Sequence, residues 1–511
     1  MSTVKKRLNE IADIITTEKA FYWLIMITMI SLPVMELLVE QHSRNFEGQP
    51  IIVEAAGIAG VAMVVTRFIK NKNSIRFYPT DLFYFLLVIF AGLSLAFTEN
   101  MLASVQGYDY DEWLTHFMAY FSLMYAGTMI EDKKLRKNIL KAFIFVLLIQ
   151  GIVGVLQSFG YEFTNCFFDG EIVTDNHWAY GLTPHFNWYS ALMTLASGCT
   201  MGLAIFAKER RGFVTYLILS AIGVYAMLAT ETRLALVSLA VLIVFFPISL
   251  FIFRIIRRDT ALFGKEMLRW FIITLMIIGM FAVLLFGFGR FKSEIRDTIN
   301  EINAISDQSA SKADENEKLA DTESKDALEE SSETSENSYF NSGFFEVEEH
   351  EPYFADDTAV GHFANNRGHI WRYGLACVPD HLFFGVGLDN YRWCFTHAPD
   401  LPHNTWTQGK GHNELIHYLV TQGLLQLLTI LALYGYTIIV GVRTVLKNED
   451  NESRTITWTF LAMFTAYVVQ SMFNSSVVNI APYFWITIGM VLCKDDQRPF
   501  GYRKSLKDTN K

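Results

Sequence analysis

Apolar residues in this chain gather into long blocks that short polar stretches separate. The blocks are roughly 17–25 residues long, enough for a helix to cross a hydrocarbon core of about 30 Å. A bilayer interior offers the backbone no water to bond to, so each block is expected to be a helix. The pattern predicts an all-α polytopic membrane protein with about twelve transmembrane helices. The expected spans are 21–40, 51–69, 82–98, 114–130, 139–158, 187–207, 213–231, 234–253, 270–289, 414–441, 456–475 and 477–493.

The connections between these blocks alternate in charge. Cytoplasmic loops carry an excess of lysine and arginine, so the basic set is expected on the cytoplasmic side. Both termini are then cytoplasmic, and the first block is expected to stay as an uncleaved span. The basic set holds Arg67, Lys70, Lys72 and Arg76, then Lys133, Lys134, Arg136 and Lys137, then Lys208, Arg210 and Arg211, then Arg254, Arg257 and Arg258, then Arg443 and Lys447. The connections that are poor in lysine and arginine are 41–50, 98–113, 159–186 and 291–411.

One long loop, expected outside the membrane, divides the chain after the ninth span. The predicted parts are transmembrane helices 1–9 in 1–290, an extracytoplasmic loop in 291–413, transmembrane helices 10–12 in 414–493 and a cytoplasmic tail in 494–511. Within the loop, residues 300–351 are acidic and nearly free of large apolar side chains. Such a segment cannot bury a core and is expected to be disordered. Residues 352–413 hold tryptophan, phenylalanine, tyrosine and histidine, and are expected to fold against the membrane and bear the site.

Composition and charge exclude several functional classes. Only 18% of the residues are charged, against about 25% in soluble proteins. Between Phe291 and Gly411 there are 23 acidic and 9 basic residues, so the net charge of −10 arises in the loop. No nucleic-acid surface is visible. No phosphate-binding loop, G-x-S-x-G or zinc spacing occurs either, so we expect no metal and no cofactor. Cys377 and Cys394 are compatible with a disulfide or with two free thiols.

A helix is expected over about 366–378 within the loop. Asn365 or Asn366 would cap its start, and Pro379 follows its end. It carries Arg367 and Arg372, whose guanidinium groups match the geometry of phosphate oxygens. The alternative is an interfacial helix whose arginines bind lipid headgroups. We favour a substrate phosphate for Arg367.

Histidine is concentrated in the same loop, with seven of the twelve between His350 and His412. Imidazole exchanges protons near neutral pH without perturbation. His412 lies where the loop meets the next span, at the height expected for the head of a lipid-linked substrate. We therefore favour His412 as the catalytic group. His403, in the similar fragment PHNTW, is a second candidate.

Two further features lie on other external connections. Arg233 sits between two apolar blocks on the side where arginine is disfavoured, so it is a functional candidate, with snorkelling to headgroups as the alternative. Asp109 and Asp111 form a pair like those that hold divalent metals in some glycosyltransferases. An acidic turn is the better interpretation of that pair.

An ordered set of motifs resembles the O-antigen ligase/polymerase family of bacterial membrane proteins. The set spans about 180–430 and comprises Gly181-Leu-Thr-Pro-His-Phe-Asn187, Thr230-Glu-Thr-Arg233, Arg367-Gly-His-Ile-Trp371, the run PDHLFFGVGLDNY, and His412-Asn413-Glu-Leu followed by VTQGLLQLL with Gly423. The acidic insertion at 300–351 departs from the motif set, and LPHNTW offers a second His-Asn pair.

The resemblance implies a fold like that of the lipid-dependent, GT-C-like glycosyltransferases, in the bacterial cytoplasmic (inner) membrane. It implies a polyprenyl-pyrophosphate-linked oligosaccharide as donor and a hydroxyl acceptor, without metal. Arg233 and Arg367 would bind the pyrophosphate and His412 would be the general base, with Arg372, His403 and Asn413 as further substrate contacts.

Three functions remain open at this point. The first is a polymerase of lipid-linked repeat units, and the second is a ligase that moves finished glycan to a lipid, wall or protein acceptor. The third is a flippase for lipid-linked sugars, which should carry charges inside several spans. Membrane lipid and other polysaccharide-export proteins are the expected partners. The clustering of charges at the external side favours an enzyme.

Overall fold

The computed structural model describes residues 2–38, 48–70, 76–107, 112–161, 178–257, 263–292, 295–296, 298–300, 303, 359–401 and 407–500. These residues form helices and no strand. The helices are α1 (Ser2–Ile15), α2 (Glu18–Leu38), α3 (Gln49–Lys70), α4 (Pro79–Ala96), α5 (Met101–Gln106), α6 (Leu114–Thr128), α7 (Lys133–Gln157), α8 (Phe186–Ile205), α9 (Arg210–Leu228), α10 (Arg233–Arg257), α11 (Phe263–Ala282), the π-helical turn η1 (Val283–Gly287), α13 (Ala359–Ala376), α14 (Trp393–His397), α15 (Glu414–Lys447), α16 (Asn451–Ser471), α17 (Ala481–Val491) and the 3-10 turn η2 (Lys494–Asp496).

The all-α polytopic membrane fold is confirmed. Each of the twelve predicted blocks coincides with a helix, and nine of the described helices are long and apolar enough to cross a bilayer. The other three are α6, α16 and α17. Helices α6 and α17 are shorter, and α16 has polar and charged residues, but most of their side chains are buried inside the bundle. A helix that faces protein rather than lipid needs less apolar surface. Twelve crossings and a GT-C-like fold stay predictions.

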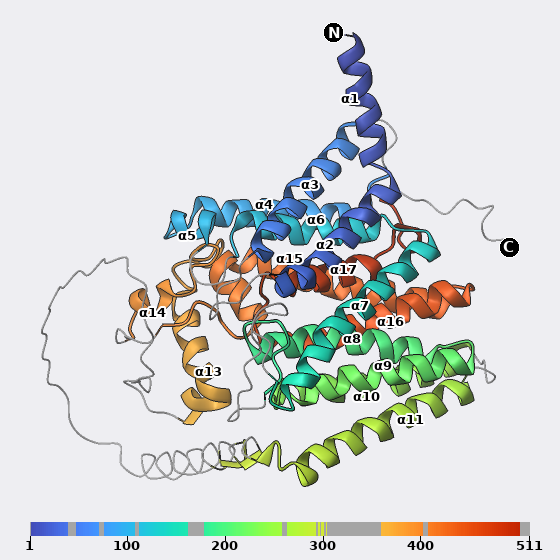
Figure 1. Cartoon of the computed structure of the whole chain (residues 1–511). Helices are drawn as coiled ribbons and strands as arrows, with labels where there is room; N and C mark the ends of the chain where they lie inside the picture. The colour runs from blue at the N-terminus through green and yellow to red at the C-terminus, as the bar shows by residue number, and fades with distance from the viewer. Residues whose placement is uncertain are drawn as a thin grey trace, which may run out of the picture.

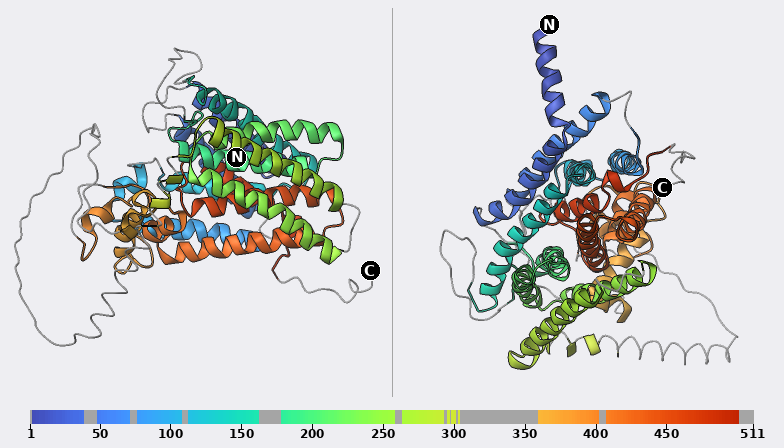
Figure 2. Two further views of the ribbon diagram at one scale, coloured as in Figure 1. Left: turned by 90° about the horizontal axis from the view of Figure 1, so that it is seen from below. Right: turned by 90° about the vertical axis from the view of Figure 1, so that its right-hand side faces the viewer.

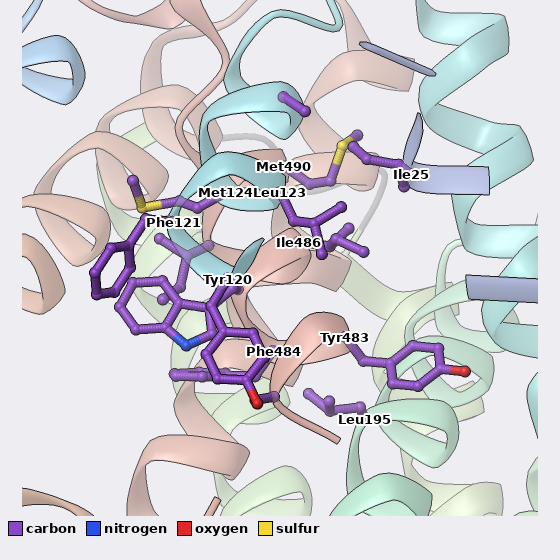
Figure 3. Packing of buried hydrophobic residues seen from close by; sticks show 14 of the residues in the cluster. Ile25, Tyr120, Phe121, Leu123, Met124, Leu195, Tyr483, Phe484, Ile486 and Met490 are labelled. Atoms are coloured by element: carbon purple, nitrogen blue, oxygen red, sulfur yellow. The ribbon is translucent and has the colours of Figure 1, made fainter. Parts of the chain in front are cut away.

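The centre of the bundle is the contact between α6 and α17 (Figure 3). Tyr120 and Phe121 from α6 and Phe484 from α17 are buried there. Farther along, Gly127 and Gly489 let the two backbones touch. A Cβ on Gly489 would lie 2.1 Å from the carbonyl oxygen of Met124. Helices in membranes pack through small residues that let their backbones approach closely, because burying apolar surface gives little driving force in lipid.

The two ends of the bundle differ in character (Figures 1 and 2). Helices α13 and α14 lie beyond one end, which we call the site end. The opposite end, which we call the basic end, carries the ion pairs of Lys133 with Asp450 at 2.8 Å and of Lys208 with Glu452 at 3.5 Å. The basic connections therefore share one end, as their alternation predicts. Which compartment each end faces stays a prediction.

Helix α15 is broken at Gly423, and a loop from the site end fills the break. Gly423 has φ 81° and ψ 177°, which is not helical. The amides of Val386 and Gly387 donate to the carbonyls of Val420 and Thr421, at 2.9 and 3.0 Å. The amide of Leu424 donates to the carbonyl of Leu382 at 2.7 Å. The loop thus supplies the backbone hydrogen bonds that the broken helix lacks, as membrane burial requires.

Replacing Gly423 by alanine should destabilise the protein. Its conformation is almost restricted to glycine, and a Cβ would lie 2.2 Å from the carbonyl oxygen of Phe383. We expect a loss of about 1–3 kcal/mol, seen as a lower unfolding temperature in detergent. The matched control is Gly435→Ala in the same helix, where nothing lies within 4 Å of the added methyl. It should stabilise slightly, by about 0.5–1 kcal/mol. Equal effects of the two variants would contradict the role given to Gly423.

The helix expected at 366–378 is found as α13, but it begins earlier, at Ala359. Asn366, expected as a possible cap, lies inside the helix with φ 64°. Asparagine tolerates this left-handed conformation better than most residues, so it marks a local distortion rather than the start of the helix. The predicted end near 378 is close to the observed end at Ala376.

Candidate functional site

The turn before α15 presents His412 at the site end. Asn413 caps the helix, and its side-chain oxygen accepts from the amides of Leu415 and Ile416, both at 3.1 Å. His412 has φ 44°, and its amide donates to Ser475 Oγ at 3.0 Å. A left-handed histidine costs free energy and persists only where its surroundings enforce it, which is typical of functional positions. The side-chain oxygen of Asn413 is engaged in this cap. A contact between Asn413 and substrate would therefore be made by its side-chain nitrogen.

The His412 ring is partly exposed, but its Nδ1 is shielded and has no hydrogen-bond partner among the described residues. Burial lowers the pKa of His412 to about 3, assisted by the charges of Arg367, His185 and Lys410. The imidazole is therefore neutral near pH 7. A neutral ring nitrogen without a partner can accept a proton from a bound hydroxyl group.

The pH dependence of catalysis should report this imidazole. If His412 is the general base, its neutral form is the active one, and activity should be lost as pH falls through the pKa of His412. A bound pyrophosphate would offset the charge of Arg367 and raise that pKa. The acid limb of kcat should therefore lie at higher pH than that of kcat/KM, because kcat/KM reports the free enzyme. Identical acid limbs in the two profiles would contradict this assignment.

The segment before α8 lies on one side of His412. His185 caps α8 by accepting the amide of Asn187 at its Nδ1, at 3.1 Å. Gln157 of α7 fastens the segment, because its Oε1 accepts from the amide of Gly181 at 2.7 Å and its Nε2 donates to the Gly181 carbonyl at 2.8 Å. The motif from Gly181 to Asn187 is thus a rigid corner at the site end.

The turn between α16 and α17 joins this corner to the His412 turn. Asn474 Nδ2 donates to the Asn187 carbonyl at 3.0 Å, while the neighbouring Ser475 accepts from His412. The amide of Ser476 donates to Glu414 Oε2 at 2.9 Å. Three segments distant in sequence therefore hold the backbone around His412.

Helix α13 brings Arg367 to His412, as the sequence predicts. Arg367 is partly buried, and its charge acts on the imidazole. Trp371 Nε1 donates to the Gly411 carbonyl at 2.9 Å and so joins α13 to the His412 turn. Arg372 is exposed and, five residues along the helix, occupies a different face from Arg367. Its contact with substrate stays a prediction.

A buried ion pair that sequence reasoning missed lies beneath the turn. Lys410 Nζ donates to Glu112 Oε2, and Tyr120 OH donates to Glu112 Oε1 at 2.9 Å. The Lys410 and Glu112 side chains are only 1% and 3% exposed. The pair joins the connection before α6 to the residue two positions before His412. Neither residue carries a local signal of the pair, because a lysine in a polar turn is usually exposed.

Arg233 begins α10 at the site end and is partly buried. The turn before it is fixed by Glu231, whose carboxylate pairs with Arg290 at 3.3 Å. The amide of Ala179 donates to the carbonyl of Ala229 at 2.9 Å, which links this turn to the corner that holds His185. Arg290, which the sequence analysis did not single out, is a further cation at this end.

The remaining predictions concern two loop segments, two cysteines and metal binding. His403, Asp109 and Asp111 lie outside the described residues, as does most of the acidic segment 300–351. Cys377 and Cys394 are buried free thiols, with Cys377 Sγ 4.0 Å from the Cys394 carbonyl oxygen. Within the described part of the chain, no cluster of three or more His, Cys, Asp or Glu residues could hold a metal ion.

Comparisons with known proteins show what part of the chain resembles. Residues 216–431 match the model of the family described as O-antigen ligase. A 129-residue stretch is 28% identical to the teichuronic acid biosynthesis protein TuaE of Bacillus subtilis (strain 168), covering 25% of this chain. That stretch covers only a quarter of the length of TuaE. The resemblance predicted from the motifs is confirmed, and the matched region contains Arg233, Arg367 and His412.

Proposed function

We propose, from the match of residues 216–431 to the O-antigen ligase family, that the protein polymerises lipid-linked oligosaccharide repeat units. The donor would be a polyprenyl-pyrophosphate-linked glycan and the acceptor a sugar hydroxyl, and the transfer would invert the anomeric carbon without a metal. The name of the relative TuaE, from teichuronic acid biosynthesis, supports a place in polysaccharide biosynthesis.

One observation carries the proposal: the His412 imidazole is held in a left-handed turn, its Nδ1 is shielded and has no partner among the described residues, and it lies within the field of the Arg367 guanidinium group. A ring nitrogen of His412 would accept the proton of the acceptor hydroxyl as the hydroxyl oxygen forms a bond to the anomeric carbon. The bond from that carbon to the pyrophosphate breaks, and its electron pair leaves with polyprenyl pyrophosphate. Arg367 and Arg233 would hold the negative charge that develops there. Fixed cations placed where charge develops are a large source of catalysis.

Replacing Arg367 should mainly affect the leaving group. We expect Arg367→Ala to lower kcat by roughly 10²–10³, the range for removing one group that stabilises developing charge. Arg367→Lys should recover only part of the loss, because lysine lacks the planar fork. Arg372 is the other predicted substrate contact on this helix, and Arg372→Ala should lower kcat far less, because its exposed side chain lies on a different face. Equal losses at the two positions would indicate general attraction of the anionic donor instead.

Product size distinguishes a polymerase from a ligase. The ligase alternative is favoured by the family description, which names that activity. Purified protein in lipid nanodiscs would receive a defined polyprenyl-pyrophosphate oligosaccharide, and products would be separated by gel electrophoresis. A ladder of repeat units supports the polymerase, and a single transfer to an added lipid acceptor supports the ligase. Absence of any new glycosidic bond, with movement of the donor across sealed vesicles, would refute both in favour of a flippase.

A further inference from the structure

Helix α1 stands away from the bundle (Figures 1 and 2), and several of its apolar side chains are exposed. Leu8, Ile11 and Ile15 follow each other at helical spacing and share one face with Ile14. Ile15 packs on the bundle core, whereas Leu8, Ile11 and Ile14 are 60%, 54% and 65% exposed. The stripe therefore begins on the bundle and continues outward without a protein partner among the described residues.

The position of α1 is fixed at the basic end. Asp13 forms an ion pair with Lys70 at the end of α3. Glu18, which begins α2, accepts the amides of Glu131 and Asp132 at 2.7 and 2.6 Å from the connection before α7. Thr17 makes the corner between the helices, since its hydroxyl donates to the Ile14 carbonyl at 2.8 Å. The helix thus leaves the bundle where α2 and α3 reach this end.

The first half of α1 is cationic. Lys5, Lys6 and Arg7 are exposed, and residues 2–9 hold no acidic side chain. At 100° per residue, Lys5 flanks the apolar stripe beside Leu8, whereas Arg7 is in line with Ile11 and Ile14 at the outer end of the stripe. Long basic side chains in these positions can keep their charge in the headgroup region while the neighbouring apolar residues enter the bilayer. The opposite face carries Lys6 and Asn9, which are polar and exposed.

We propose that α1 lies on the bilayer surface at the basic end, with Leu8, Ile11 and Ile14 in the acyl boundary and Lys5 and Arg7 on anionic phospholipid headgroups. The occupant of the apolar face is thus the lipid that surrounds the bundle. Trp23 on α2 and Ile69 on α3 are 57% and 73% exposed near the same end, which marks adjoining surface as lipid-facing. The proposal does not depend on the glycan chemistry.

The test uses the whole protein in vesicles. Spin labels on Leu8→Cys and Ile11→Cys report the apolar face, and labels on Lys6→Cys and Asn9→Cys are the matched controls on the polar face. The unsubstituted protein corrects for label on the natural cysteines. Collisions with oxygen, which concentrates in lipid, and with a water-soluble nickel chelate are measured in phosphatidylcholine with and without phosphatidylglycerol.

The expected result is high oxygen and low nickel exposure at positions 8 and 11, with the reverse at 6 and 9. Replacing Lys5 and Arg7 by glutamine should lower the ratio of membrane-bound to free α1 about fivefold per residue. This effect is expected only in vesicles that contain phosphatidylglycerol. Nickel exposure at all four positions would overturn the proposal, because α1 would lie in water. Protection of positions 8 and 11 from both reagents would overturn it in favour of a protein partner. Indifference to phosphatidylglycerol would overturn the recognition of anionic lipid.

Discussion

Replacing His412 by alanine should slow glycan transfer by a factor of roughly 10²–10⁴, the contribution of a positioned general base. This corresponds to about 2.7–5.5 kcal/mol of transition-state stabilisation. The amide of His412, which donates to Ser475, and the cap at Asn413 are backbone and neighbouring features that alanine retains. The loss should therefore appear in kcat, measured with purified protein and a lipid-linked donor, while donor binding is unchanged.

The matched control is His397, which is exposed on α14. His397→Ala should retain wild-type kcat if catalysis depends on the position of His412 rather than on histidine content. The positive φ at position 412 strains alanine as well as histidine, so unfolding temperature must be followed in both variants. A His412→Ala protein that is stably folded and transfers glycan at the wild-type rate would refute the assignment.

The second large effect is expected at the buried Glu112–Lys410 pair. Lys410→Met would leave the Glu112 carboxylate buried with only Tyr120 as partner. Breaking a buried ion pair from one side costs about 3–5 kcal/mol. We expect a marked fall in unfolding temperature and, because Lys410 is two residues from His412, a loss of activity in the protein that remains folded. Thermal unfolding in detergent, followed by size-exclusion chromatography, measures the first effect.

Two controls separate the pair from a general charge effect. The exchange Glu112→Lys with Lys410→Glu restores opposite charges and should recover part of the stability lost in either single variant. Lys133→Met breaks the exposed ion pair with Asp450 at the basic end, and such surface pairs contribute little. If Lys133→Met destabilised the protein as much as Lys410→Met, burial would not be the cause.

The positions of the helices follow from the sequence because hydropathy acts over whole blocks. Every predicted block coincides with a helix, and the site helix with Arg367 was predicted to within two residues at its end. Arg367 and His412 were both expected at the site-bearing part of the loop, from the motifs and the turn before a span. These features are local or depend on which side of the membrane a segment faces.

Features that depend on contacts between distant segments were missed. Glu112 and Lys410 are 298 residues apart, and nothing in either local pattern identifies the other. The break in α15 was missed because Gly423 lies in an apolar run that reads as continuous helix. The break is stabilised by hydrogen bonds from the loop around Gly385. The start of α13 was predicted too late. Asparagine is a common helix cap, but Asn366 lies inside the helix in a left-handed conformation.

The anomeric configuration of the new glycosidic bond tests the central claim most directly. A single displacement, with His412 as base and pyrophosphate as leaving group, forms one bond as the other breaks on the opposite face of the sugar. The product linkage, assigned by nuclear magnetic resonance, should therefore be inverted relative to the donor linkage. Retention of configuration would require a covalent glycosyl-enzyme intermediate or two displacements, and it would contradict a mechanism in which His412 acts only as a base.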